Sequence, residues 1–117
     1  LAMPEEYLKL LRERNREFEV WDKLPDGLNG VDFLYQTRVQ KERFTSLNEY
    51  KKIKDKFILD ASFKKYLDKG VKLMHPLPRV NEMDSSLDAH PNAIYFQQAR
   101  NGLYIREALL GLVLGRI

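Results

Sequence analysis

One short stretch constrains the fold of this chain more than any other. Residues 71–74, apolar apart from Lys72, run directly into His75-Pro76-Leu77-Pro78. Proline fixes φ near about −65° and lacks an N–H, so it cannot donate into a central β-ladder. We therefore predict a strand that ends at His75, followed by a stiff loop with free backbone carbonyls. Ligands of open α/β sheets bind at the carboxyl ends of strands, so this loop is a candidate binding segment. Taken alone, the segment is more simply interpreted as a rigid connection between a strand and a loop.

A second apolar stretch breaks off in the same way. Residues 31–35 are apolar apart from Asp32, and polar residues 36–43 follow. In an extended segment Arg38 and Gln40 lie on the same side. A guanidinium fork beside an amide suits a carboxylate ligand. The alternative is a solvated run of charges over residues 38–43.

Composition bounds the class of protein. The chain has 117 residues, 44% of them hydrophobic and 32% charged, which predicts at most one soluble globular domain. The net charge of +3 is spread along the chain and argues only weakly for a polyanionic partner. There is no cysteine, which excludes disulfides and thiolate metal sites and is typical of a cytoplasmic protein. With only two histidines we expect no metal site, and we expect neither a signal peptide nor a membrane helix.

Several residues are typical of the beginning or the end of a helix. Pro4 suits the first position of a helix, Ser46 with Glu49 forms a capping box, Asp60 suits an N-cap, and Gly70 suits a left-handed helix end. Strands alternate with helices, which predicts an α/β fold. The expected elements are a helix over 4–14, a half-buried strand over 18–21, a turn over 25–30, a buried parallel strand over 31–35, a helix over 46–54, a short strand or turn over 57–59, a helix over 60–69, a strand over 71–74 and a helix over 93–114.

The last of these helices is apolar nearly all round in its final turns. Apolar residues recur on every face between Leu103 and Leu114. A helix of this kind is buried on all sides in its native setting. We therefore expect that another domain or subunit covers it.

Three motifs, in order, identify a family. They are residues 37–44, residues 75–82, and residues 95–98 followed by Asn101-Gly102. Together they resemble the C-terminal part of aspartate carbamoyltransferase, and the resemblance covers nearly the whole chain. It implies an incomplete α/β domain with a parallel sheet, of the aspartate/ornithine carbamoyltransferase kind. Residues 1–92 would form part of the aspartate-binding domain, and residues 93–117 would return to an N-terminal carbamoyl-phosphate-binding domain that this chain lacks.

The resemblance gives roles to the first polar loop. Arg38 and Gln40 would hold the side-chain carboxylate of aspartate, and Glu42 would orient Arg38. Residues 45–54 match the region that closes over aspartate in the family. Tyr50 would either brace that closure or be an ordinary tyrosine of an amphipathic helix.

The second loop would act through its backbone. By resemblance, the carbonyls of Leu77 and Pro78 accept hydrogen bonds from the carbamoyl amide and from the attacking amine of aspartate. Arg79 and Glu82 would support the loop without touching substrate. Asn81 is a departure, since many family members carry Asp there.

Neither histidine is assigned to catalysis. An imidazole can exchange protons near neutral pH, so His75 invites a catalytic interpretation. We favour a hydrogen-bonded histidine at a strand end, because the family's carbonyl-polarising histidine lies in its N-terminal portion. His90, before Pro91, is expected in a loop.

The implied activity is transfer of the carbamoyl group of carbamoyl phosphate to L-aspartate, giving N-carbamoyl-L-aspartate and phosphate in pyrimidine biosynthesis. The resemblance implies a cytoplasmic homotrimer that needs no cofactor. The family's phosphate-binding loop is absent here, so this chain alone should be inactive.

Ornithine carbamoyltransferase is the nearest alternative family, but it typically has Cys where Pro76 stands and lacks the Arg-x-Gln pair. A non-catalytic domain that binds an acidic metabolite or a partner protein is the main alternative. Nucleic-acid binding through the basic residues of 9–16 is weaker, because no aromatic residues interleave them.

Overall fold

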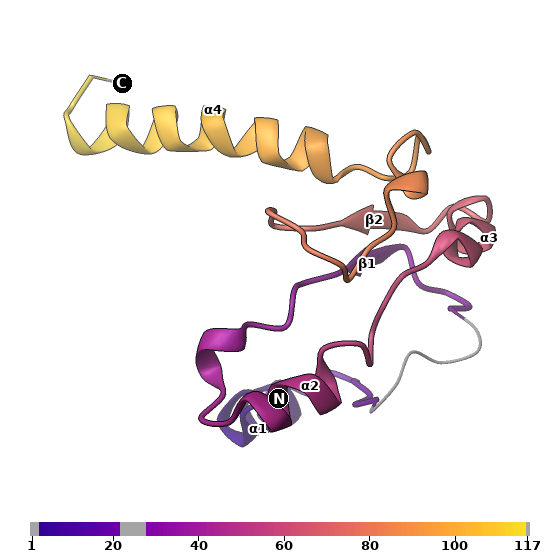
Figure 1. Cartoon of the computed structure of the whole chain (residues 1–117). Helices are drawn as coiled ribbons and strands as arrows, with labels where there is room; N and C mark the ends of the chain where they lie inside the picture. The colour runs from indigo at the N-terminus through magenta and orange to yellow at the C-terminus, as the bar shows by residue number, and fades with distance from the viewer. Residues whose placement is uncertain (1–2, 22–27, 117) are drawn as a thin grey trace.

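The computed structural model describes residues 3–21 and 28–116 (Figure 1). This part of the chain is α/β, as predicted. Its helices are α1 (Glu5–Glu13), α2 (Leu47–Ile53), α3 (Lys64–Leu67) and α4 (Tyr95–Val113), and its strands are β1 (Phe33–Tyr35) and β2 (Lys72–Met74). Short 3-10 turns connect them, namely η1 (Lys41–Arg43), η2 (Ala61–Phe63) and η3 (Ser85–Leu87).

The two strands pair in parallel, with Leu34 opposite Leu73 at the centre. On its other side β2 contacts an extended segment just before α4. The Leu73 N–H donates to the Asn92 carbonyl at 2.8 Å, and the Ile94 N–H donates to the Leu73 carbonyl at 2.9 Å. β2 is therefore bonded on both edges, which fixes the strand from which the loop at His75 begins.

The hydrophobic core lies around β2 and the short helices beside it. Leu73, Leu67 and Tyr95 are fully buried there. Because Tyr95 is the first residue of α4, the long helix is anchored to the core by its first turn. The other buried apolar residues are Leu28, Leu59, Phe63, Tyr66, Val71, Met83 and Leu87.

The local signals are confirmed where they act within a few residues. The Ser46 hydroxyl accepts from the Asn48 N–H at 3.2 Å, and an Asp60 oxygen accepts from the Ser62 N–H at 2.8 Å. Gly70 ends α3 with φ +101°, a conformation that glycine adopts without steric cost. Pro4 lies one position earlier than predicted, at the N-cap of α1.

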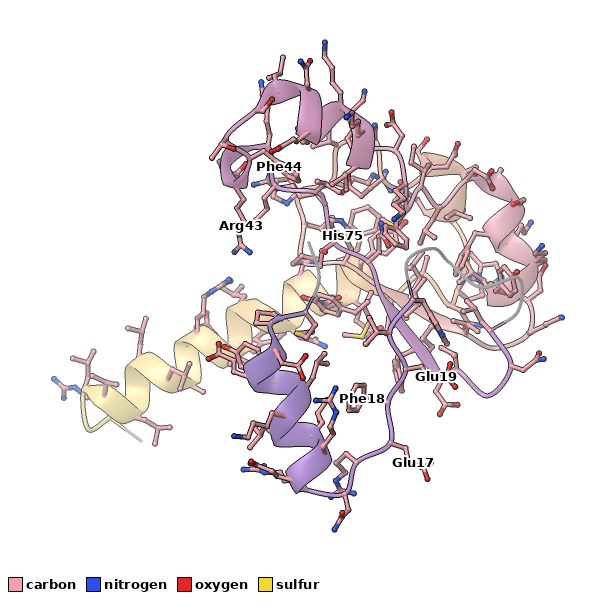
Figure 2. All side chains as sticks on the ribbon, turned by 90° about the horizontal axis from the view of Figure 1, so that it is seen from below. Glu17, Phe18, Glu19, Arg43, Phe44 and His75 are labelled. Carbon is pink, nitrogen blue, oxygen red and sulfur yellow. The ribbon has the colours of Figure 1, made fainter. Side chains whose placement is uncertain are left out.

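The strand predicted over residues 18–21 is wrong. The segment after α1 is extended but pairs with no other described segment. Phe18 instead lies beneath the Arg12 guanidinium, whose central carbon is 5.5 Å from the centre of the Phe18 ring (Figure 2). Val20 and Trp21 are exposed. A strand needs a neighbour to satisfy its N–H and C=O groups, and alternation alone does not supply one. Residues 25–27 of the predicted turn lie outside the described residues, and the turn at residues 29–30 is present.

The strand over 31–35 is parallel as predicted, but shorter, and the prediction that it is buried is wrong. Phe33 is 57% exposed and Tyr35 is 52% exposed. Parallel strands are normally covered on both faces. In the described part of the chain Lys72 lies over the Phe33 ring and Gln98 reaches the Tyr35 hydroxyl, but these contacts leave about half of each aromatic side chain exposed.

α4 projects from the core, as Figure 1 shows. Its far turns expose apolar residues on every side, including Leu103, Leu109 and Val113. The radius of gyration is 17.2 Å, whereas a compact chain of this length has about 13 Å. Nothing among residues 3–21 and 28–116 covers these turns, and the expectation that another domain or subunit does so stays a prediction. None of the described helices is long and apolar enough to cross a membrane.

Candidate functional site

The loops that follow β1 and β2 border one pocket of about 760 Å³. Carboxyl ends of parallel strands meet at one edge of a sheet, which is why two loops distant in sequence come together here. Figure 2 shows Arg43 reaching from η1 toward the space beside the His75 loop. The pocket is lined by Met3, Pro4, Thr37, Arg38, Gln40, Arg43, His75, Pro76, Leu77 and Pro78.

Arg38 and Gln40 both line this pocket, as their spacing predicted. The Arg38 guanidinium is paired with Glu42, with Nη2 at 2.7 Å and Nη1 at 3.4 Å from the two carboxylate oxygens. The hydrogen bond from Arg38 lowers the pKa of the Glu42 carboxyl, and the same bond raises the pKa of Arg38. Glu42 thus fixes the plane of a guanidinium that still faces the pocket.

His75 is a buried, hydrogen-bonded histidine at the end of β2, which is the interpretation we favoured. Its Nδ1 accepts from the Leu77 N–H at 2.8 Å, so the ring proton is on Nε2. Nε2 donates to the Glu82 carboxylate at 2.8 Å. The Leu77–Pro78 peptide bond is cis, and Leu77 has φ +50°. Positive φ is rare for a leucine and is found disproportionately at functional sites.

Glu82 lies beneath the loop and is almost completely buried. Its carboxylate accepts from the N–H groups of Val80 at 3.1 Å and Asn81 at 3.2 Å, besides His75. Burial raises the pKa of this carboxyl, but hydrogen bonds from its own N–H, from Val80 and from His75 outweigh that effect, and the net pKa lies below the ordinary value. The ionised Glu82 carboxylate therefore stabilises the loop by accepting hydrogen bonds from several of its residues.

Arg79 points away from the pocket toward η3 and α4. It donates to both Asp88 oxygens, and the Tyr95 hydroxyl also donates to Asp88. Burial and the Asp88 hydrogen bond raise the pKa of the Tyr95 phenol to about 12. Sequence reasoning did not find Asp88 or Tyr95 as partners of Arg79, because no spacing rule links residues across a loop and a 3-10 turn.

Gln98 was also missed as part of the site. Its Oε1 accepts from the His75 N–H at 3.1 Å, and its Nε2 lies 3.4 Å from the Tyr35 hydroxyl. One side chain of α4 therefore reaches the ends of both strands. The motif at residues 95–98 was the only sequence signal, and it indicated the family, not this contact.

Tyr50 lies beside the same loops. Its ring packs edge-on against Phe44, with centres 5.7 Å apart. With Arg38 and Asn81 it lines a small second pocket of about 40 Å³. The Asn81 side chain donates to Asp55 at 3.2 Å, which ties the His75 loop to the end of α2. Both interpretations of Tyr50, brace and helix residue, fit this position.

Among residues 3–21 and 28–116, no cluster of three or more His, Asp or Glu side chains could hold a metal ion. His90 lies in a loop, as expected, with its Nε2 3.1 Å from Asp68. The pocket is thus lined by two guanidinium groups, those of Arg38 and Arg43, by the Gln40 amide and by the loop at residues 75–78, a set that suits an organic acid.

Residues 2–113 match the family described as "Aspartate/ornithine carbamoyltransferase, Asp/Orn binding domain". The chain belongs to this family. The aspartate carbamoyltransferase catalytic subunit of Clostridium novyi (strain NT) is 44% identical over 98% of this chain. The alignment covers 38% of that relative, so the chain spans well under half the length of the curated relatives it matches.

Solved structures agree with this Asp/Orn-binding domain. The catalytic subunit of M. jannaschii aspartate transcarbamoylase superposes with a TM-score of 0.82 and 35% identity, over 98% of this chain and 38% of that one. A Trypanosoma cruzi aspartate transcarbamoylase, solved with carbamoyl phosphate and aspartate, superposes with a TM-score of 0.77 and 33% identity, over 92% of this chain and 36% of that one. The recognition of the family from residues 37–44, 75–82 and 95–98 is thereby confirmed.

Proposed function

We propose that this chain is the aspartate-binding part of an aspartate carbamoyltransferase. The complete enzyme would transfer the carbamoyl group of carbamoyl phosphate to L-aspartate, giving N-carbamoyl-L-aspartate and phosphate. The observation that carries the proposal is the pairing, in one pocket, of a guanidinium held by Glu42 with the carbonyl-rich loop at His75. The Trypanosoma cruzi relative, solved with both substrates, supports it.

The first loop would bind the acceptor. Glu42 takes one hydrogen bond from each Nη of Arg38, which leaves the edge formed by Nε and one Nη to donate two hydrogen bonds to a carboxylate. The Gln40 amide adds a third donor from the same side. A shorter or longer acid would place its amine at a different depth in the pocket. We therefore assign the side-chain carboxylate of aspartate to Arg38 and Gln40, with Glu42 holding the Arg38 plane.

The second loop would align the reacting groups. The carbonyls of Leu77 and Pro78 accept hydrogen bonds from the carbamoyl amide and from the amine of aspartate. The neutral amine nitrogen forms a bond to the carbamoyl carbon, the bond from that carbon to the phosphate oxygen breaks, and the departing phosphate takes up the proton that the amine loses. Acceptors fixed in place before the reaction cost no reorganisation in the transition state, and correct orientation accounts for much of such a rate enhancement. Arg79 and Glu82 support this loop without contacting substrate.

The remaining parts of the site would lie outside this chain. We propose that an N-terminal domain binds the phosphate of carbamoyl phosphate and covers the apolar faces of α4. The division at residues 92 and 93, assembly as a homotrimer, a cytoplasmic location and a place in pyrimidine biosynthesis are part of the same proposal and rest on the family resemblance.

The complete polypeptide that contains this chain provides the test. It would be supplied with carbamoyl phosphate and either L-aspartate or L-ornithine, and carbamoylated product would be measured. We expect product from aspartate alone. Turnover of ornithine, or no turnover of either amine by a folded complete enzyme, would contradict the proposal.

A further inference from the structure

The loop at Leu77 and Pro78 is fastened by one imidazole. We propose that His75 is a positioning residue that directs the carbonyls of this loop by holding the Leu77 N–H at Nδ1. The inference rests on the proposed function, because its consequence for catalysis depends on those carbonyls meeting substrate.

The hydrogen bonds of His75 show which ring nitrogen accepts a hydrogen bond and which one donates. Nδ1 accepts from the Leu77 N–H at 2.8 Å, and Nε2 donates to Glu82 at 2.8 Å. The main chain of His75 is held as well, since its N–H donates to Gln98 at 3.1 Å. The imidazole is almost completely buried, so water does not compete for either nitrogen. His75 therefore has a single orientation.

The hydrogen bond from Leu77 to the imidazole is made by a residue with an unfavourable backbone conformation. Leu77 has φ +50°, a region that a leucine rarely occupies without outside support. Its N–H is turned back onto the imidazole two residues earlier. Since N–H and carbonyl of one residue are related by only φ and ψ, fixing the N–H helps to fix the direction of the Leu77 carbonyl.

The chain contains a matched copy of this arrangement far from the pocket. His90 also precedes a proline, its Nδ1 accepts from the Asn92 N–H at 3.0 Å, and its Nε2 lies 3.1 Å from the Asp68 carboxylate. His90 does not line the pocket. Both histidines should stabilise their loops, but only His75 should affect the reaction.

Two substitutions separate the two ring nitrogens. The oxygen of asparagine takes roughly the place of Nδ1 and still accepts, whereas the amide nitrogen of glutamine takes roughly the place of Nε2 and still donates. His75→Asn thus keeps the bond to Leu77, and His75→Gln keeps the bond to Glu82. The controls are His90→Asn and His90→Gln. All four would be made in the complete polypeptide and measured well below their unfolding temperatures.

We expect His75→Gln to lower kcat with aspartate by about 10-fold to 100-fold, since misplacing a reacting group by about 1 Å has effects of that size. His75→Asn should stay within about 3-fold of the unsubstituted enzyme, and both His90 variants should leave kcat unchanged. Equal losses of kcat in the two His75 variants, or a loss in His90→Gln as large as in His75→Gln, would overturn the proposal.

Hydrogen exchange of the peptide spanning residues 75–82 gives a readout that does not need activity. The Leu77 amide should exchange faster in His75→Gln than in His75→Asn, and His90→Gln should not alter it. Unchanged exchange in His75→Gln overturns the positioning role even if the enzyme carbamoylates aspartate. If exchange follows this expectation but the unsubstituted enzyme does not carbamoylate aspartate, the proposed function fails and the catalytic role of His75 fails with it, while its hold on Leu77 stands.

Discussion

Arg79 and Asp88 face each other as two planar groups, each guanidinium nitrogen on its own carboxylate oxygen. The pair joins the His75 loop to the residue that follows η3, and the Tyr95 hydroxyl connects the same carboxylate to α4. Three segments of chain therefore meet at one carboxylate beside the binding loop. Bidentate pairs of this kind are the more specific and stronger ones among ion pairs.

Arg79→Met should destabilise the complete enzyme by about 1.5–3 kcal/mol, the usual effect of losing hydrogen bonds to a charged group. The effect should fall in the lower half of that range, because both side chains are still partly in contact with solvent. Arg79→Lys should not restore the lost stability, since an ammonium cannot reproduce the fork. Urea unfolding of the three proteins gives the measurement, and equal midpoints would contradict the role of the pair.

The same pair predicts how stability depends on pH. The hydrogen bond from Arg79 holds the pKa of Asp88 below its ordinary value, and the Tyr95 hydroxyl adds to the effect. A carboxyl with a lowered pKa in the folded state contributes stability above its unfolded pKa, about 3.9 for Asp, and loses it as pH falls through the folded pKa. Glu82 has the same sign. Stability should therefore decline on the acid side of about pH 4.

Arg79→Met removes the main cause of the shift at Asp88, so its stability should fall less steeply in acid. Urea midpoints between neutral pH and about pH 3 would be compared for the two proteins. Parallel curves would show that Asp88 does not contribute in the way described.

Arg38→Ala should weaken aspartate binding by at least about 10-fold, because a carboxylate in the pocket would lose charge-assisted hydrogen bonds worth at least about 1.4 kcal/mol. Arg38→Lys should not rescue it. Carbamoyl phosphate binding should hardly change, since its phosphate would be held by the other domain. Steady-state kinetics against both substrates decide the matter. Normal saturation by aspartate with lost carbamoyl phosphate binding would place Arg38 in the wrong half of the site.

Residues 1–117, produced alone, should self-associate or bind a hydrophobic dye. The apolar side chains of α4 are exposed around the helix, and apolar patches above a few hundred Å² are unusual on monomers. Analytical ultracentrifugation and dye fluorescence are the measurements. A monodisperse monomer that binds no dye and unfolds cooperatively would contradict the prediction. Leu109→Lys with Val113→Lys should reduce association. The control Lys9→Glu also changes the charge, but on the exposed face of α1, and should not reduce it.

Signals that act within a few residues were readable from the sequence, and those that depend on distant partners were not. Ser46, Asp60 and Gly70 each set a helix end through contacts one to three residues away, and the structure has all three. The prediction of a strand over 18–21 was wrong because alternating apolar and polar residues indicate which side chains share a face, but not whether another strand lies beside the segment. Asp88 and Gln98 were missed because their partners lie nine and 23 residues away.

The position of the site has a general explanation. The carboxyl ends of neighbouring parallel strands lie at one edge of a sheet, which explains why Arg38, Gln40, Leu77 and Pro78 line one pocket. The two loops were grouped from the sequence through the family resemblance. Their roles toward substrate came from the family resemblance and stay predictions. The internal support of the loop by His75 and Glu82 needed the structure, since nothing in the spacing shows which nitrogen of an imidazole accepts.

α4 is anchored at Tyr95, and Gln98, one turn further on, is bonded to the start of the His75 loop. At about 1.5 Å per residue the helix is about 28 Å long, so a shift of about 3 Å at Val113 tilts it by about 6° and moves Gln98 by about 0.5 Å. A hydrogen bond tolerates a displacement of that size. The free end of α4 can therefore follow a moving neighbour through several ångströms while the His75 loop stays in place. A displacement of the far end of α4 thus becomes a much smaller displacement at Gln98. The carbonyls of the His75 loop therefore move little when a neighbour that contacts the apolar end of the helix moves.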